Sequence, residues 1–229
     1  MAIAFYDLMG QDGRNFSPYC WRTRLALAHK GLNYEHKGTA FTAIGQVGAG
    51  DMKTVPIIDD GGKMVGDSNA IADYLEATYP DRPSLFGGPG GRGMCYFFHS
   101  WTNAVVHAGL ANMVIKDIHD HVCPEDKDYV RTSREKIFGA ALEDVQAGRE
   151  DRVEAFRASL TPLRLTVRSQ AFLGGDTANY ADYTVFGAFQ WARTISDFQL
   201  VADDDPVFAW FLRVGELFDG LGRNTPGYY

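Results

Sequence analysis

The chain has 229 residues, of which 45% are hydrophobic and 22% are charged. This composition is typical of a folded globular protein and not of a disordered or fibrous one. The formal net charge of −7 argues against nucleic acid or an anionic membrane as the main partner. No apolar run approaches the ~18 residues of a membrane span, and three cysteines are too few for a disulfide framework. We therefore expect a reducing, cytoplasmic setting.

The first part of the chain alternates short apolar runs with one helical pattern. Residues 3–8 predict a first strand, and residues 33–37 predict a second. Between them, Ser17 fits the N-cap of a helix and Pro18 fits its first position, where a proline is tolerated. A strand–helix–strand unit of this kind is expected to close as a parallel, right-handed crossover.

A hairpin and a further helix follow. Residues 54–59 and 63–65 predict two antiparallel strands, because the turn residues Asp59-Asp60-Gly61-Gly62 lie between them. Gly66-Asp67-Ser68 then opens a helix that ends near Tyr79-Pro80. The order of elements is β-α-β and then β-β-α, which indicates an α/β domain.

Beyond residue 80 the pattern is helical. Residues 81–93 hold two prolines and five glycines and are interpreted as a linker. Helical spacing of apolar residues then covers residues 95–118, 128–145, 152–170, 183–196 and 206–218, with a capping-box pattern at Asn179 to Asp182. We expect an α/β domain at 1–80, a linker at 81–93 and an all-helical domain at 94–229.

Several motifs together resemble the cytosolic glutathione transferases. Ser17-Pro18-Tyr19-Cys20 follows the first strand, where a glutaredoxin has Cys-Pro-Tyr-Cys. Val55-Pro56 lies where the family keeps a cis-proline, Asp67-Ser68 opens a helix, and Phe172 to Asp182 resembles a helix-capping motif of the second domain. The resemblance covers nearly the whole chain. It implies a thioredoxin-like domain followed by a helical-bundle domain, glutathione as co-substrate and a homodimer.

Within this family the chain is similar to the bacterial glutathione-dependent β-etherases of lignin breakdown and to the related fungal etherase-like transferases. The similarity is carried by Ser17 to Thr23, Lys30-Gly31, residues 143–152 and residues 218–223. It implies an enzyme in which the thiolate of glutathione attacks an electrophilic carbon. The specific reaction would be cleavage of a β-aryl ether to a glutathione thioether and a phenol.

Ser17 has two interpretations from the sequence. A serine at an N-cap can do no more than satisfy its own helix. Its hydroxyl also lies at the positive end of a helix, where a hydrogen bond to a charged group is worth about 1.5–3 kcal/mol and the helix terminus about 0.3–1 kcal/mol. Together these correspond to roughly one to three pKa units, enough to ionise a thiol whose free pKa is near 8.5. The resemblance implies that Ser17 is catalytic.

The resemblance also implies a glutathione-binding set. Val55 and Pro56 would offer backbone groups to the cysteinyl part if their bond is cis, although an ordinary trans proline at a strand edge is the alternative. Asp67 and Ser68 would bind the γ-glutamyl end at a helix N-terminus, or would only cap that helix. Lys53 is expected to meet the glycyl carboxylate, and Lys37 is a second candidate, so the set is Ser17, Lys53, Val55, Pro56, Asp67 and Ser68.

An aryl electrophile is expected to need aromatic and apolar walls. The candidates for this pocket are Phe16, Trp21, Phe41, Trp101, His107 and Met113, each of which could equally be core. His119, His121 and Cys123 resemble metal ligands only superficially, because no second cluster completes a four-ligand set. No metal is therefore expected.

Two other functions remain open from the sequence. Cys20 near the start of the first helix could carry a glutathione-dependent thiol–disulfide reduction, although a cysteine inside such a helix is more often a small buried hydrophobe. A non-catalytic protein could instead hold aromatic ligands in the same pocket.

Overall fold

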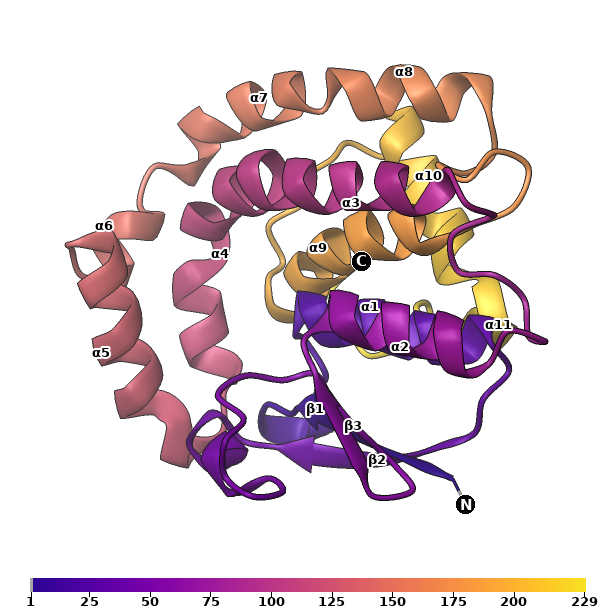
Figure 1. Cartoon of the computed structure of the whole chain (residues 1–229). Coiled ribbons are helices and arrows are strands. Elements are labelled where there is room, and N and C mark those ends of the chain that lie inside the picture. The colour runs from indigo at the N-terminus through magenta and orange to yellow at the C-terminus, as the bar shows by residue number, and fades with distance from the viewer. Residues whose placement is uncertain (1) are drawn as a thin grey trace.

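A four-stranded mixed sheet forms the base of the N-terminal half in the computed structural model, which describes residues 2–229 (Figure 1). The strands β1 (Ile3–Leu8), β2 (Tyr34–Thr39), β3 (Ile57–Asp60) and β4 (Lys63–Gly66) lie in the order β2-β1-β3-β4. β1 pairs in parallel with β2, whereas β3 is antiparallel to both of its neighbours. The predicted crossover and hairpin are confirmed. The third strand begins three residues later than predicted, because the chain first passes Pro56, which has no N–H for a ladder.

Two helices cover one face of this sheet, α1 (Pro18–His29) and α2 (Ser68–Thr78) (Figure 1). They pack on each other, and α1 also packs along α9 (Tyr180–Ile195) of the helical half. The contact with α9 is close because Gly187 has no side chain: a Cβ there would lie 2.4 Å from the carbonyl oxygen of Pro18. The start of α1 is therefore held directly against the core helix of the second domain.

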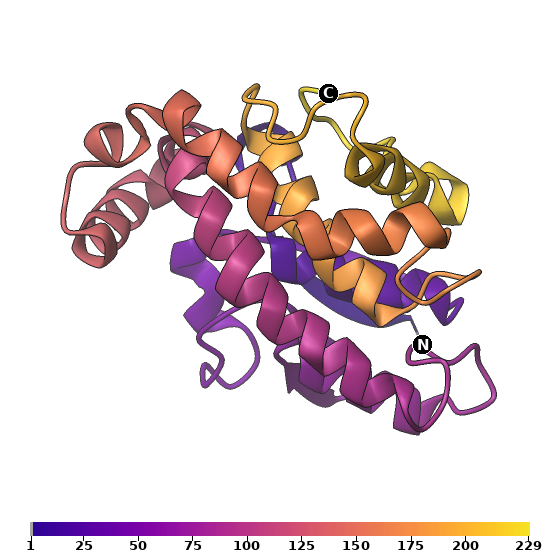
Figure 2. The same ribbon diagram turned by 90° about the horizontal axis from the view of Figure 1, so that it is seen from above.

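The second half is helical, as predicted. Its helices are α3 (Gly91–Trp101), α4 (Ala108–His121), α5 (Lys127–Phe138), α6 (Leu142–Gln146), α7 (Arg149–Ser159), α8 (Thr161–Ser169), α9, α10 (Pro206–Gly215) and α11 (Leu217–Gly220). A π-helical segment, η3 (Thr102–His107), joins α3 to α4, so that Figure 2 shows them as one continuous rod. Short 3-10 segments are η1 (Gln11–Gly13), η2 (Phe41–Gln46) and η4 (Pro124–Asp126).

Three of the predicted helices are shorter than the pattern indicates. The helix predicted at 128–145 stops at Phe138, because Gly139 has φ +72° and reverses the chain before α6. The helix predicted at 152–170 is split into α7 and α8, and Pro162 lies in the first turn of α8. The last predicted helix breaks after Gly215, since Phe218 and Asp219 have positive φ.

Helix α9 forms the centre of the helical half and is buried along nearly its whole length. Its start is fixed by the predicted capping box, which is confirmed: Asn179 accepts from Ala181 N, and Asp182 accepts from Asn179 N at 3.1 Å. Asp182 is fully buried and also accepts from Trp210 Nε1 at 2.9 Å. One carboxylate therefore joins α9 to α10.

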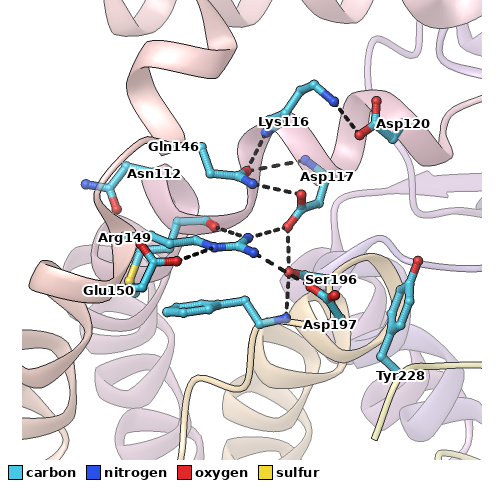
Figure 3. A network of polar contacts seen from close by, with 12 residues as sticks. Asn112, Lys116, Asp117, Asp120, Gln146, Arg149, Glu150, Ser196, Asp197 and Tyr228 are labelled. Carbon is cyan, nitrogen blue, oxygen red and sulfur yellow. Dashed lines mark hydrogen bonds and ion pairs between the residues drawn. The ribbon is translucent and has the colours of Figure 1, made fainter.

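A polar network ties α4 to the helices that follow it (Figure 3). Asp117 accepts from Arg149 Nη1 at 2.8 Å, from Gln146 Nε2 at 2.8 Å and from Ser196 Oγ at 2.5 Å. Gln146 Oε1 in turn accepts from the backbone N of Lys116 at 2.8 Å. The charge-dense stretch that begins at residue 143 is therefore partly turned inward onto α4.

No helix within residues 2–229 is long and apolar enough to cross a membrane.

Candidate functional site

A cavity of about 450 Å³ lies where the start of α1 meets the helical half. Its walls come from the end of β1, the η2 region, the loop before β3, and one side of α4, α5 and α9. Most of the wall is apolar or aromatic, and none of the lining residues is an aspartate or glutamate. The lining comprises Leu8, Phe16, Ser17, Pro18, Tyr19, Phe41, Ile44, Lys53, Thr54, Val55, His107, Ala111, Ile115, Ile118, Tyr129, Arg134, Ile137, Phe138 and Trp191.

Ser17 lies in this wall and caps α1. Its backbone is extended (φ −62°, ψ 121°), and its Oγ accepts a hydrogen bond from Cys20 N at 3.3 Å. The capping interaction uses only a lone pair of the hydroxyl, so the O–H remains free to donate. Because Pro18 follows at the first helical position, the hydroxyl stays at the positive end of α1. The capping role and a role as donor to an anion are thus compatible.

Cys20 lies one turn further along α1 and faces away from the cavity. Its side chain is buried, and it is not among the lining residues. Burial, followed by the nearby charge of Asp7, raises the pKa of the Cys20 thiol well above its usual value. The thiol is consequently protonated near neutral pH, which makes it a poor nucleophile.

The loop before β3 brings two predicted glutathione-binding residues to the cavity. The Val55–Pro56 bond is cis, so the cis alternative is the observed one. Val55 lines the cavity, and within residues 2–229 its backbone N–H and C=O make no hydrogen bond. Lys53 lies at the rim with an exposed side chain and has no carboxylate partner in the part of the chain described. Lys37, the other candidate, pairs with Glu35 on β2.

Asp67 and Ser68 form a second helix start and are not among the lining residues of the cavity. Asp67 caps α2 by accepting from Asn69 N at 2.9 Å and Ala70 N at 3.0 Å, in a backbone conformation with φ +72°. Ser68 is buried, and its Oγ has no hydrogen-bond partner among residues 2–229. A buried hydroxyl without a partner is costly in a folded protein, and an incoming ligand group would satisfy it.

Of the six candidates for the electrophile pocket, three line the cavity and three do not. Phe16, Phe41 and His107 line the cavity. Trp21, Trp101 and Met113 do not: Trp21 is buried against Phe186 with ring centroids 6.0 Å apart, Trp101 packs against Phe98, and Met113 is fully buried. Helix periodicity explains the difference. Trp21 lies on the face of α1 that meets α9, and Met113 lies off the row Ala111, Ile115 and Ile118 that α4 presents to the cavity.

One wall of the cavity, which α5 and α9 provide, was not predicted from the sequence. Tyr129, Arg134, Ile137 and Phe138 come from α5, and Trp191 comes from α9. The spacing of Arg134, Ile137 and Phe138 puts them on one face of a helix that is otherwise polar, and this was the only available signal. Which cavity that face meets depends on the tertiary fold and not on local pattern.

Tyr19 was also missed, although it lines the cavity close to Ser17 in the sequence and makes a polar contact with His107. Its hydroxyl lies 3.4 Å from His107 Nδ1, the two rings meet edge-on, and the Arg22 guanidinium lies 4.5 Å above the tyrosine ring. Burial, then the charges of Arg22 and His99, lower the pKa of His107 to about 3. His107 is therefore neutral near pH 7 and acts as a hydrogen-bonding group. His107 is the last residue of the π-helical segment η3, and such segments are often found at functional sites.

Within the described part of the chain, no group of three or more His, Cys, Asp or Glu residues is arranged to hold a metal ion. His121 lies 2.9 Å from the hydroxyl of Tyr228, and Cys123 contacts the carbonyl oxygen of Met9.

Comparisons with known proteins agree with this architecture. Residues 13–83 match the glutathione S-transferase N-terminal domain, and residues 93–205 match the glutathione S-transferase C-terminal domain. A maleylacetoacetate isomerase of Dictyostelium discoideum is 37% identical over 72 residues, 28% of this chain and 33% of the relative. A zeta-class glutathione S-transferase of Euphorbia esula is 32% identical over 143 residues, 58% of this chain and 61% of the relative. The chain thus spans between a third and three fifths of these curated relatives.

Solved structures of fungal proteins cover almost the whole chain. A glutathione S-transferase of Ceriporiopsis subvermispora, solved in complex with glutathione, superimposes with a TM-score of 0.84 at 26% identity, covering 96% of this chain and 98% of the other. A glutathione transferase of Phanerochaete chrysosporium gives a TM-score of 0.77 at 27% identity, covering 96% and 92%. The two domain matches together span most of the sequence in the order that this fold requires, and the chain belongs to the glutathione S-transferase family.

Proposed function

We propose that this protein binds glutathione with its thiolate at Ser17, and that the thiolate cleaves a β-aryl ether. The sulfur forms a bond to the electrophilic carbon while the bond from that carbon to the aryl oxygen breaks. The phenolate that leaves takes up a proton, so the products are a glutathione thioether and a phenol. The observation that carries the proposal is the free hydroxyl of Ser17, held at the start of α1 in the wall of a cavity lined mostly by apolar and aromatic side chains.

The polar groups of the cavity wall and of the start of α2 that lack partners within residues 2–229 fit the parts of glutathione. The free backbone groups of Val55 suit strand-like pairing with the cysteinyl residue, and Lys53 suits the glycyl carboxylate. The buried hydroxyl of Ser68 and the N-terminus of α2 suit the γ-glutamyl carboxylate, with Asp67 near the ammonium group. The complex of the Ceriporiopsis protein with glutathione supports this ligand for a chain of the same fold.

Ser17 acts in this proposal by stabilising the thiolate. A free thiol with a pKa near 8.5 is only a few per cent ionised at pH 7. A charge-assisted hydrogen bond from Ser17, together with the positive end of α1, is worth about 2–4 kcal/mol and shifts the equilibrium toward the thiolate. Ser17 itself is not the nucleophile.

The rest of the cavity suits an aryl ether. Phe16 and Phe41 face each other with ring centroids 6.4 Å apart, and such walls favour an aromatic substrate. Tyr19, with its hydroxyl beside the neutral His107, is a hydrogen-bond donor for the oxygen of the departing phenolate. This assignment rests on the position of the two side chains in the lining of the same cavity as Ser17.

Two alternatives receive less support. Thiol–disulfide reduction through Cys20 requires an accessible thiolate, whereas Cys20 is buried and its thiol pKa is raised. A non-catalytic protein that stores aromatic ligands needs the aromatic walls but has no use for the free hydroxyl of Ser17.

Incubation with glutathione and a β-aryl ether tests the proposal, with phenol release and thioether formation followed by chromatography. We expect the wild type to release phenol and Ser17→Ala to lose about 10- to 150-fold in rate, the equivalent of one charge-assisted hydrogen bond. Cys20→Ser and the surface control Ser169→Ala are expected to keep full activity. If the wild type releases no phenol from any of several β-aryl ethers, the etherase assignment is wrong. Loss of activity in Cys20→Ser alone would favour the reductase.

We further infer that the protein is a cytoplasmic homodimer with domain limits near residues 80 and 94, as the family resemblance implies. Light scattering measures the mass of the particle in solution, and a monomer at micromolar concentration would contradict the dimer.

A further inference from the structure

The cavity is positively charged in a negatively charged protein. The whole chain carries a formal charge of −7, yet the lining contains Lys53 and Arg134 and no carboxylate. His107 adds no charge, because burial lowers its pKa to about 3. A ligand in the cavity therefore meets two positively charged side chains, those of Lys53 and Arg134.

Arg134 has no counter-ion of its own. Its guanidinium lies 5.5 Å from the centroid of the Phe41 ring, and its Nη1 donates to Ser133 Oγ at 3.1 Å. No aspartate or glutamate of residues 2–229 forms an ion pair with it. Arg131, one turn earlier on α5, pairs with both Glu135 and Glu143 at 2.8 Å. Carboxylates are thus available along this helix, but the arginine that faces the cavity is left without one.

The two cations belong to different halves of the molecule. Lys53 lies on the loop before β3, beside the cis peptide bond, where the proposed function assigns it to the glycyl carboxylate of glutathione. Arg134 lies on α5, opposite that loop, among the aromatic side chains of Phe41, Tyr129 and Phe138. The Phe41 and Tyr129 ring centroids are 5.9 Å apart, so a planar ring beside them would bring its substituent near Arg134.

We propose that Arg134 binds a carboxylate on the second substrate, so that the preferred electrophiles are aryl compounds bearing a carboxylate group. A guanidinium presents two parallel N–H donors that match the two oxygens of a carboxylate. The aromatic walls bind the ring, and Arg134 fixes which end of the molecule points away from Ser17. This inference rests on the proposed function, in which Lys53 pairs with the glycyl carboxylate of glutathione and Arg134 is left for the second substrate.

Ligand binding without turnover tests the inference. The probes are 4-phenoxybenzoate and its neutral analogue 4-phenoxybenzamide, titrated calorimetrically into the whole protein with glutathione at saturation. We expect the wild type to bind the carboxylate about tenfold more tightly than the amide, and this preference to shrink with added salt. Arg134→Gln is expected to bind the carboxylate and the amide equally. Arg134→Lys is expected to keep part of the preference, because lysine keeps the positive charge but lacks the two parallel N–H donors of the guanidinium. Lys136→Gln removes one positive charge from an exposed position on the same helix and is expected to keep the full preference.

The outcomes separate this inference from the proposed function. Equal binding of both probes by the wild type would overturn it, as would a preference that survives Arg134→Gln or disappears in Lys53→Gln. A higher KM for glutathione in Arg134→Gln would also overturn it, because Arg134 would then serve the first substrate. If no phenol is released in the assay above but the tenfold binding preference is observed, the etherase assignment is wrong and the carboxylate site is supported.

Discussion

Asp182 and Asp126 are both fully buried, and each accepts several hydrogen bonds, but their donors lie in different parts of the molecule. Asp182 accepts hydrogen bonds from four groups that all belong to the helical half: Leu173 N at 2.7 Å, Gly174 N at 3.1 Å, Asn179 N at 3.1 Å and Trp210 Nε1 at 2.9 Å. Asp126 accepts from Phe41 N at 2.7 Å, Thr42 N at 2.9 Å and Thr42 Oγ1 at 2.8 Å. All of these donors lie in the other domain.

The two carboxylates stabilise different parts of the molecule. Asp182 joins a loop, the start of α9 and α10, so it holds one domain together. Asp126 lies at the end of η4 and clamps the η2 region, whose first residue, Phe41, is a wall of the cavity. The first carboxylate is part of the fold, whereas the second positions a surface that the substrate meets.

Replacement of Asp182 is expected to have the largest effect. Asp182→Ala leaves three backbone N–H groups and the indole of Trp210 without their acceptor in the core, and we expect a loss of about 3–5 kcal/mol in the free energy of unfolding. Urea denaturation followed by tryptophan fluorescence measures it. A loss below 1 kcal/mol would show that other groups fix the start of α9.

Asp126→Ala is expected to cost less stability and to affect the site more. Three donors lose their acceptor, so we expect a loss of about 2–3 kcal/mol in the free energy of unfolding. Release of Phe41 is expected to raise the KM for an aryl electrophile several-fold while leaving the KM for glutathione nearly unchanged. Steady-state kinetics with each substrate varied in turn measures both constants. Equal changes in the two would remove the contrast with Asp182.

His107 makes the cavity wall sensitive to acid. Its pKa is near 6.5 in the unfolded chain and about 3 in the folded protein, so the unfolded state binds more protons between these values. Its contribution to stability is complete above about pH 6.5 and is lost as the pH falls toward 3, at no more than about 1.4 kcal/mol per pH unit.

The variant His107→Gln lacks this titration. Denaturation curves of the two proteins at several pH values between 4 and 7 compare their free energies of unfolding. We expect the wild type to lose stability faster than the variant as the pH falls. Parallel losses would mean that the buried imidazole is not the group responsible.

The surface pair of Arg131 and Glu143 is expected to have the smallest effect. Glu143 is solvent-exposed and Arg131 is partly exposed, so screening by water and salt removes most of the attraction. Glu143→Gln should leave the thermal unfolding midpoint within experimental error and the kinetics unchanged. A clear decrease in either would show that α5 and α6 are coupled to the cavity through this pair.

Most of the fold was accessible from the sequence because its signals are local. The proline after Ser17, the turn at Gly61-Gly62 and the capping box at Asn179 each fix a nearby piece of backbone. The breaks after Phe138 and near Leu160 were missed, because a helical spacing of apolar residues can continue across a turn in which the chain changes direction.

The candidate site was predictable only where a motif carries it. Ser17 and Val55 belong to short motifs, and both line the cavity. Arg134 and Trp191 lie on helices far away in the sequence, and no local pattern relates them to Ser17. The buried clamp of Asp126 on Phe41 was equally hidden, because its partners are more than 80 residues apart in the chain.

The π-helical segment η3 has a consequence for changes in chain length. Because each residue of an α-helix turns the chain by about 100°, the widened turn at Thr102–His107 lets α3 face α9 while α4 turns Ala111, Ile115 and Ile118 toward the cavity. Deletion of a single residue here would restore an ordinary helix with little rotation of one half of the rod against the other, because the widened turn takes up one extra residue. Homologues that lack one residue in this segment would therefore present the same row of side chains to their substrate, whereas an ordinary helix of unchanged length would turn that row away by about 100°.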